Sequence, residues 1–379
     1  VGRFRGNDAP RRRWAAVLDA EGASLVADGE GLSSLGAGQD ARPRVLAVSR
    51  DAALVLERVG LAETLMLRQA GASRAIDTVN ADKHDIRLIE PVAVPHLDAQ
   101  GRATQSWLYL PPGPVRGLIV RVYPGAADSF VWWDPLTLTY GTRSTILAAA
   151  GYAVLSPSMT SEAPPGERGD LYVRAVDLAV DAALAAHPEL PADRIAIYGH
   201  SFGGYAALEI ATRWARYQTY IASASFSDFA GHWGGLTPTA RIQPEDRMSL
   251  QSGQAFTEAG QGGLGGPPWQ DVDAYRQTSP YLRAERVTAP VLLLTADLDF
   301  VAPTQAEQMF SALSRNGKTA RLVTFWGEHH HAWGPANIRE RYRLILDWLD
   351  QTLPNPDVTA PTSGGLPTSA PSSRRPPPP

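Results

Sequence analysis

The sequence predicts an α/β protein with a mostly parallel sheet covered by helices on both faces, preceded by a small β-rich N-terminal region. From Val115 onward, short apolar runs alternate with segments of helical periodicity. This alternation is typical of parallel strands joined by helices. Before about residue 104, short apolar stretches alternate with turn-forming clusters instead, which indicates small antiparallel β structure.

The N-terminal region, residues 1–104, contains several candidate strands. They are Trp14–Leu18, Ser24–Val26, Arg44–Val48, Ala53–Leu56 and Glu63–Leu67. The region is too short for a complete multi-bladed propeller, whose blades each hold four strands, but it has room for one or two blades. A small β-rich cap of unrelated topology is the alternative.

The alternating region gives a series of strands and helices. Strands are expected at 117–123, 152–155, 195–197, 220–224, 290–295 and 321–325, and helices at 144–150, 171–186, 205–214, 303–315 and around 338–349. Within 171–186, Val173, Val176, Val180 and Leu184 recur on one helical face. Pro303 suits the first turn of a helix that Asn316-Gly317 then ends.

Two stretches differ from this pattern. The segment His232–Ala274 is rich in glycine and proline and predicts an irregular insert, of the kind that forms lids or binding loops. Residues 354–379 are rich in Pro, Ser and Thr and lack the apolar side chains needed to pack, so we expect a disordered tail. The predicted domains are therefore 1–104, 105–353 and 354–379.

The amino-acid composition and net charge argue against some classes of binding partner. A formal net charge of −4 and a pI near 6.1, without clustered Lys or Arg, argue against nucleic acid and anionic membranes as partners. No apolar run approaches the roughly 20 residues that span a bilayer. The absence of cysteine excludes a thiol nucleophile. The composition suits a soluble protein of the cytoplasm, the periplasm or the cell exterior alike, and a start at Val1 without a signal pattern suggests a fragment or processed form.

The chemistry centres on Gly199-His200-Ser201-Phe202-Gly203, which lies between an apolar run and a helix-forming segment. A serine on such a tight turn between strand and helix projects its hydroxyl above the sheet, and the flanking glycines let the turn close. Ser201 is therefore the candidate nucleophile, and the strand, turn and helix together predict an α/β-hydrolase fold.

A serine nucleophile needs a base, and the base needs a carboxylate that orients it. In this fold the acid and then the histidine follow the serine along the chain, on loops after later strands. Asp299, after the strand at 290–295, is the candidate acid, with Asp297 as its competitor. The alternative for both is capping of the next helix.

The base must come from His329, His330 and His331, which directly follow the last strand. We predict His330, the middle residue, with His329 as the next candidate. A metal site would need a further histidine or carboxylate from elsewhere in the chain, and no H-E-x-x-H motif is present. We therefore expect neither a metal nor a cofactor.

The oxyanion of the reaction needs hydrogen-bond donors. One is expected to be the backbone N–H of Phe202, the residue after the nucleophile. The second should come from the loop after the early strand, Val122–Ala126, where Tyr123 stands at the strand end.

Over residues 105–353 the chain resembles the prolyl oligopeptidase family of serine peptidases. The matching motifs are Trp107–Pro112, Val122–Gly125, Gly199–Gly204, Gly265–Trp269, Ser279-Pro280, Asp299 with Pro303 and Gln305, and Gly327–His331. The resemblance implies that Tyr123 donates its hydroxyl to the oxyanion. The family's usual G-E-G-H-G pattern places the base at His330, with His329 and His331 in place of both glycines, and its G-x-x-D pattern favours Asp299.

This resemblance implies a serine peptidase or oligopeptidase that acts through an acyl-enzyme on a peptide or small acyl substrate without a cofactor. A carboxylesterase with the same triad is the first alternative. An inactive binding protein on a hydrolase scaffold is the second. The family usually carries an N-terminal β-propeller, which 1–104 is too short to complete.

Overall fold

The computed structural model divides into two compact units, Val1–Leu88 and Ile89–Pro379, here called the N-terminal and C-terminal units. The residues it describes are 15–18, 23–27, 32–37, 44–49, 51–69, 72–87, 89–127, 142–235 and 252–353. The tail expected over 354–379 lies outside them. Within this described part, no helix has both the length and the apolar character that crossing a bilayer requires.

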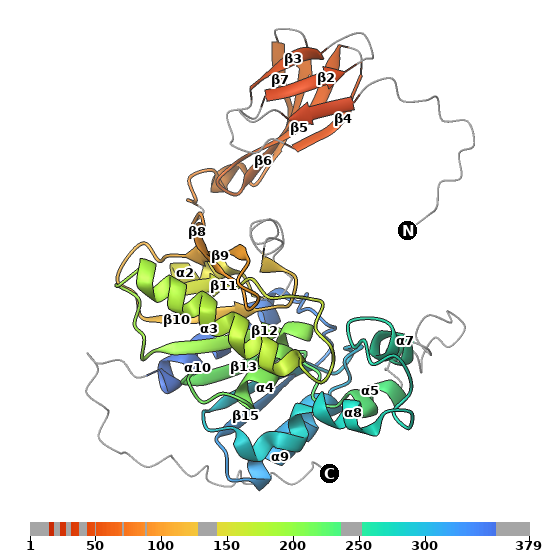
Figure 1. Cartoon of the computed structure of the whole chain (residues 1–379). Helices are drawn as coiled ribbons and strands as arrows, with labels where there is room; N and C mark the ends of the chain where they lie inside the picture. The colour runs from red at the N-terminus through yellow and green to blue at the C-terminus, as the bar shows by residue number, and fades with distance from the viewer. Residues whose placement is uncertain are drawn as a thin grey trace, which may run out of the picture. The chain divides into compact units, whose positions relative to one another are not determined.

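The N-terminal unit contains two antiparallel sheets (Figure 1). One is a meander in chain order, formed by β4 (Arg44–Val48), β5 (Ala52–Val59), β6 (Ala62–Gln69) and β7 (Ala72–Val79). The other is formed by β1 (Ala15–Leu18), β2 (Ala23–Ala27) and β3 (Leu32–Ala37). The expected β-rich region is confirmed. Four strands in sequence order match the make-up of one propeller blade, and the origin of this unit as a propeller remnant stays a prediction.

The C-terminal unit is built on one eight-stranded sheet with the order β15-β14-β13-β12-β10-β11-β9-β8. Its strands are β8 (Val92–Leu97), β9 (Ala103–Tyr109), β10 (Gly117–Val122), β11 (Tyr152–Ser156), β12 (Ile195–His200), β13 (Thr219–Ser223), β14 (Val291–Ala296) and β15 (Ala320–Phe325). Six neighbouring strands are parallel, and β9 and β8 complete the sheet antiparallel. This mostly parallel sheet confirms the predicted fold class.

The division between the units falls between Leu88 and Ile89, ahead of the boundary near residue 104 that the sequence suggested. The reason is strand pairing. β9 pairs with β11 and β8 pairs with β9, so both strands belong to the large sheet. Their short antiparallel pattern resembles that of the preceding strands, and only the pairing partner distinguishes them.

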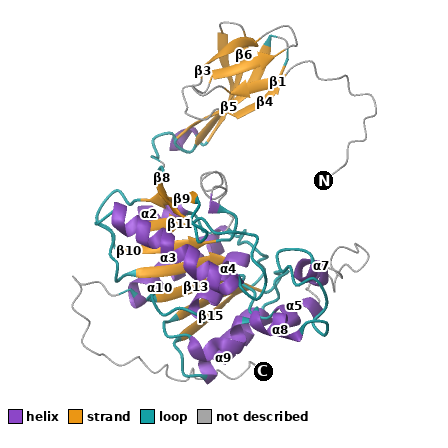
Figure 2. Ribbon diagram, viewed as in Figure 1, coloured by secondary structure: helices purple, strands orange, loops and turns teal. Residues whose placement is uncertain are grey.

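Helices cover both faces of this sheet (Figure 2). They are α2 (Ser144–Ala149), α3 (Arg168–Ala186), α4 (Phe202–Ala211), α9 (Thr304–Arg315) and α10 (Pro335–Thr352). Successive strand residues point to opposite faces, so Ile197 of β12 packs in a core with residues of α3, α4 and α9. Its neighbour Ala196 packs in the other core, with Leu147 of α2 and Trp348 of α10.

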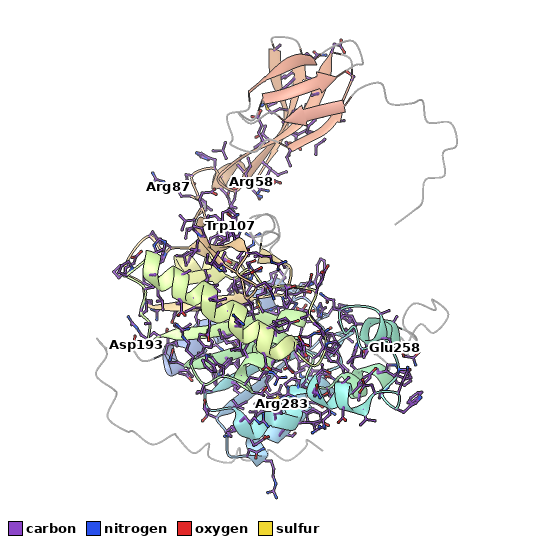
Figure 3. The ribbon with its side chains drawn as sticks, viewed as in Figure 1. Arg58, Arg87, Trp107, Asp193, Glu258 and Arg283 are labelled. Carbon is purple, nitrogen blue, oxygen red and sulfur yellow. The ribbon has the colours of Figure 1, made fainter. Side chains whose placement is uncertain are left out.

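The insert expected to be irregular contains short helices. They are α5 (Phe229–Gly234), α7 (Ser252–Glu258) and α8 (Val272–Gln277). An aspartate starts two of them: the side chain of Asp228 accepts the N–H of Ala230, and that of Asp271 accepts the N–H of Ala274. The indole of Trp233 donates to Glu258, labelled in Figure 3, and so ties α5 to α7. Between α7 and α8, residues 259–271 form turns and loops, as expected of an irregular insert.

A buried carboxylate anchors α4 in the unit. Glu209 is fully buried and accepts hydrogen bonds from Arg283 at 2.7 Å and from Arg213 at 2.9 Å. Burial raises the pKa of Glu209, and the two guanidinium groups oppose that rise. Arg283, labelled in Figure 3, belongs to the short helix η3 (Pro280–Arg286), so this ion pair joins η3 to the helix that follows the serine.

Candidate active site

Ser201 lies on a sharp turn between β12 and α4. Its backbone has φ 59° and ψ −127°, a conformation that a residue with a side chain rarely adopts. The Ser201 N–H donates to the carbonyl of Ser223 on the neighbouring strand at 2.8 Å, which holds the turn against the sheet. This strained geometry is the one expected of a nucleophile elbow.

Glycine is required on both sides of the serine because the chain passes very close to itself. A Cβ on Gly199 would lie 1.9 Å from the carbonyl oxygen of Gly203. A Cβ on Gly203 would lie 2.2 Å from the carbonyl oxygen of Val122 on β10. Neither contact can be relieved by moving a side chain, since both involve backbone, so the pattern seen in the sequence follows from packing.

The structure brings Ser201, His330 and Asp299 together. The Ser201 hydroxyl lies 2.7 Å from Nε2 of His330, and Nδ1 of the same ring lies 2.8 Å from Oδ1 of Asp299. The three residues follow β12, β15 and β14, strands whose carboxyl ends meet at one edge of the sheet. With Nδ1 donating to the carboxylate, Nε2 is free to accept the serine proton.

The two candidate aspartates occupy different places. Asp299 is fully buried, and its Oδ1 also accepts the N–H of Val301 at 2.8 Å. Asp297 instead accepts the N–H of Gly327 at 2.6 Å and so holds the backbone of the histidine loop. Only Asp299 contacts the imidazole of His330.

The three adjacent histidines also separate. His330 contacts the serine, while exposed His329 has Nδ1 3.3 Å from the carbonyl of Leu298. The His331 ring packs on the ring of His200, with centroids 4.8 Å apart. Burial, together with the nearby charges of His330 and Arg341, lowers the pKa of His331 to about 4.

Glu328 fixes the loop that carries the histidines. Its carboxylate is largely buried and accepts the N–H groups of Trp333 and Gly334 and the side-chain amide of Asn337. Burial opposes ionisation, but these hydrogen bonds together keep the pKa of Glu328 below its ordinary value. This role of Glu328 was not predicted, and its only signal in the sequence is an acidic residue directly before the three histidines.

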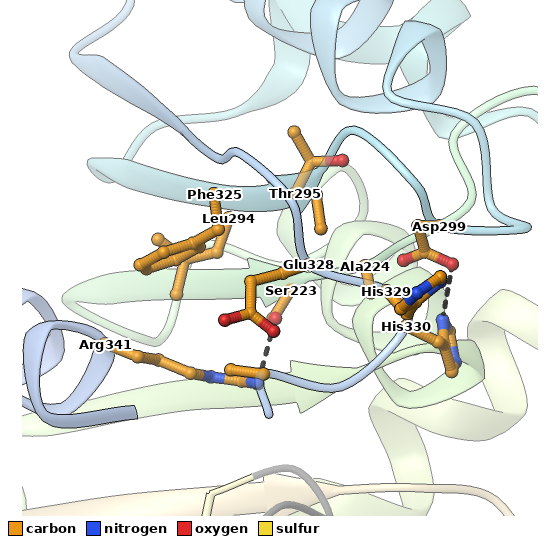
Figure 4. A pocket seen from close by; sticks show the side chains of 12 residues that line it. Ser223, Ala224, Leu294, Thr295, Asp299, Phe325, Glu328, His329, His330 and Arg341 are labelled. Carbon is orange, nitrogen blue, oxygen red and sulfur yellow. Dashed lines mark hydrogen bonds and ion pairs between the residues drawn. The ribbon is translucent and has the colours of Figure 1, made fainter. Parts of the chain in front are cut away.

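Beneath the triad lies a polar network around Arg341 that was not predicted from the sequence, and Figure 4 shows its hydrogen bond to Ser223. Arg341 of α10 is buried, and its Nη2 lies 3.0 Å from the Tyr198 hydroxyl, 3.0 Å from the Ser223 hydroxyl and 3.1 Å from Nδ1 of His200. Burial, and then the charge of Arg341, lower the pKa of His200. A cavity of about 20 Å³, large enough for a single water molecule, lies between this network and Asp299.

Tyr123 lines a pocket of about 220 Å³ together with Ser201 and His330. Its hydroxyl lies 3.2 Å from the side-chain amide nitrogen of Gln261, a residue of the insert that no sequence motif indicated. Phe202 is the first residue of α4, where backbone N–H groups have no partner within a helix. Both expected oxyanion donors thus come from segments next to the nucleophile.

Aromatic rings pack next to Ser201, beginning with the ring of Phe202. The Phe202 ring lies 6.4 Å from that of Phe256, which stacks on Phe226 at 4.7 Å. Phe229 and His232 of α5 pack against Phe226 at 5.5 Å and 4.8 Å. Helices α4, α5 and α7 therefore contribute to one apolar cluster beside the serine, called the aromatic cluster below.

One group of side chains among the described residues could hold a metal ion. Each of His200, His330 and His331 offers a ring nitrogen, and these atoms lie within 4.8 Å of one another. From the sequence, His330 was predicted as the base and His331 was one of its neighbours, whereas His200 was noted only as part of the motif around Ser201, because it follows a different strand.

In comparisons with known proteins, this chain is similar to one peptidase family and to individual proteins that are named peptidases. Residues 173–355 match the model of the prolyl oligopeptidase family. An uncharacterized peptidase of Bacillus subtilis, YuxL, is 28% identical over 228 residues, which cover 57% of this chain and 32% of that protein. A probable chloroplastic glutamyl endopeptidase of Oryza sativa is 27% identical over 248 residues, 59% of this chain and 24% of that protein.

Among solved structures, an acylaminoacyl peptidase in complex with Z-Gly-Gly-Phe-chloromethyl ketone superimposes with a TM-score of 0.65 at 18% identity. The match covers 93% of this chain and 55% of that one, and it supports the fold. The chain thus spans about a third or less of the two curated relatives and about half of the solved one.

Proposed function

Because its region 173–355 belongs to the prolyl oligopeptidase family, we propose that the chain is a serine peptidase that cleaves peptide bonds through an acyl-enzyme. The relatives that it matches are named peptidases, which supports amides rather than simple esters as substrates. The pocket beside Ser201, about 220 Å³, is smaller than the roughly 300 Å³ and more of drug-sized ligand sites, so it suits a single substrate side chain.

In this mechanism the Ser201 oxygen attacks the scissile carbonyl while Nε2 of His330 takes the hydroxyl proton. The same nitrogen then gives that proton to the leaving amine, and water repeats the sequence to release the acyl group. Asp299 keeps the proton on Nδ1 of His330 and stabilises the imidazolium. The Tyr123 hydroxyl and the Phe202 N–H donate to the oxyanion.

The observation that carries this proposal is the continuous hydrogen-bond chain from Ser201 through His330 to Asp299, at 2.7 and 2.8 Å. It starts at a serine held in a strained backbone conformation and ends at a fully buried carboxylate. Such a chain supplies both the base that a serine nucleophile needs and the group that orients that base.

The test combines a fluorophosphonate label with a panel of aminoacyl amides, peptidyl amides and simple esters. We expect the wild-type protein to take the label and to hydrolyse peptidyl amides, and Ser201→Ala to lose both properties. Ser225→Ala, which removes a buried hydroxyl from a neighbouring loop, is the matched control and should keep them.

Two results would overturn the proposal. Hydrolysis of esters without any amide would identify a carboxylesterase. Absence of both labelling and turnover in the wild-type protein would favour a binding protein on a hydrolase scaffold.

A further inference from the structure

Three imidazole rings meet beside the nucleophile. The ring centroids of His200, His330 and His331 are 4.8 to 5.0 Å apart in each pair. His200 ends β12, whereas the other two belong to the loop after β15. Three histidines from two segments, with ring nitrogens within 4.8 Å, are a ligand set of the kind that zinc sites use.

His200 contributes a nitrogen that the triad does not use. Its side chain is 9% exposed and lines the pocket that also contains Ser201, His330 and His331. Its Nδ1 faces Arg341 and Ser223, so Nε2, on the opposite edge of the ring, faces away from them. Among the described residues, this buried Nε2 has no hydrogen-bond partner.

The hydrogen bonds around Arg341 indicate how Nε2 of His200 can be left without a proton. Nη2 of Arg341 carries two hydrogens but has three neighbours within 3.1 Å. In one arrangement, the hydroxyls of Tyr198 and Ser223 accept these two hydrogens, and a proton on Nδ1 of His200 is donated to Ser223 at 3.2 Å. In that tautomer, Nε2 of His200 presents a lone pair to the pocket.

We propose that His200, His330 and His331 form a binding site for Zn²⁺ or a similar late transition-metal ion, and that the bound ion reversibly inhibits the enzyme. The inhibitory part rests on the proposed function. His330 binds the ion through Nε2, the atom that accepts the Ser201 proton, so the bound enzyme lacks its base. Nδ1 of His330 stays on Asp299, which is the usual carboxylate partner of a metal-bound histidine.

The surroundings set the preferred ion and its affinity. Imidazole ligands favour Zn²⁺, Cu²⁺ and Ni²⁺ over Mg²⁺ and Ca²⁺, which prefer oxygen ligands. Arg341 and Arg121 lie close enough to act on the charge of His200, so they weaken the binding of any cation, while the Asp299 carboxylate favours it. The ring nitrogens must also approach to about 3.3 Å to share a tetrahedral zinc with bonds of about 2.0 Å.

The activity test is a Zn²⁺ titration of peptidase turnover, each variant being compared with its own metal-free rate. We expect inhibition of the wild-type enzyme that a chelator reverses and that Mg²⁺ does not cause. His331→Gly and His200→Phe should each raise the half-inhibiting Zn²⁺ concentration about tenfold or more, since even loss of an outer partner of a ligand has effects of that size. His329→Gly, which changes an exposed neighbour outside the cluster, should leave it unchanged.

A binding measurement tests the metal site independently of the proposed peptidase activity. Calorimetric titration of Ser201→Ala with Zn²⁺ should show one ion per chain, and the double variant Ser201→Ala/His331→Gly should lose it. If no substrate is hydrolysed but this binding is found, the metal site stands and the peptidase proposal fails. If the enzyme is active and Ser201→Ala does not bind Zn²⁺, or if His331→Gly is inhibited as strongly as the wild type, the site is disproved.

Discussion

The two sides of Ser201 are held together by different kinds of interaction. On one side, His330 is hydrogen-bonded to Asp299, and Arg341 is hydrogen-bonded to Ser223, each with a definite length and direction. On the other side, Phe202, Phe226 and the rest of the aromatic cluster pack ring against ring. Hydrogen bonds specify single atoms, whereas ring packing specifies shape and volume. We therefore expect changes on the polar side to alter reaction rate and changes on the aromatic side to alter stability.

The largest expected effect concerns the acid on the polar side. Asp299→Asn would favour the wrong tautomer of His330, because an amide nitrogen can donate to Nδ1 where the carboxylate only accepts. We expect kcat on a peptidyl amide to fall by up to about 10⁴. Asp297→Asn is the matched control; its side-chain oxygen can still accept the N–H of Gly327, so turnover should change little. The opposite ranking of the two variants would assign the acid to Asp297.

A smaller effect is expected at the border between the two sides. Tyr123→Phe keeps the ring and deletes only the hydroxyl, so it removes one oxyanion donor. Loss of such a donor costs about 3 to 4 kcal/mol in the transition state, a fall in kcat of about 10² to 10³ with KM nearly constant.

Gln261→Ala is the control for this prediction because it removes the partner of the Tyr123 hydroxyl and leaves the hydroxyl itself. It should keep most of the wild-type kcat. Wild-type kcat in Tyr123→Phe would mean that backbone amides alone hold the oxyanion, and equal losses in both variants would give Gln261 a positioning role.

The smallest effect tests the aromatic side. Burial lowers the pKa of His232, in the aromatic cluster, to about 4. Above pH 6.5 this residue is neutral in both folded and unfolded chains. Between pH 6.5 and 4 the unfolded chain binds a proton that the folded one does not, so stability falls on acidification, by up to about 3 kcal/mol. His232→Phe should lose less stability between pH 7.5 and 4.5 than the wild type.

The measurement is the free energy of unfolding from denaturant titrations at the two pH values. His329→Phe, at an exposed position, serves as the control and should keep the acid sensitivity of the wild type. An unchanged pH dependence in His232→Phe would show that His232 is protonated in the folded protein as readily as in the unfolded one.

Much of the fold and of the candidate site could be predicted because the signals are local. Glycines around Ser201 indicate a turn that has no room for a side chain, and apolar runs indicate buried strands. The order serine, acid, histidine follows from loops at the ends of successive strands. The places of Asp299 and His330 were predicted on this basis, and their roles remain predictions.

Other features depend on pairings that no local pattern records. His200 and His331 are far apart in the sequence and meet only because β12 and β15 end at the same sheet edge. Arg341 belongs to a helix that the sequence predicts, but its burial beneath the triad depends on how that helix packs. The helices of the insert are too short for periodicity to show, and aspartate caps could have indicated only α5 and α8.

The distribution of the triad along the chain has a consequence for the timing of activity during synthesis. The N–H of Ser201 donates to Ser223 of β13, and the proposed base, His330, lies 129 positions after Ser201. At ribosomal rates of about 5 to 20 residues per second, that spacing delays a complete triad by roughly 6 to 26 seconds. During this interval the growing chain holds Ser201 without the base that the proposed mechanism needs, so the proposed activity would begin only after His330 has been made.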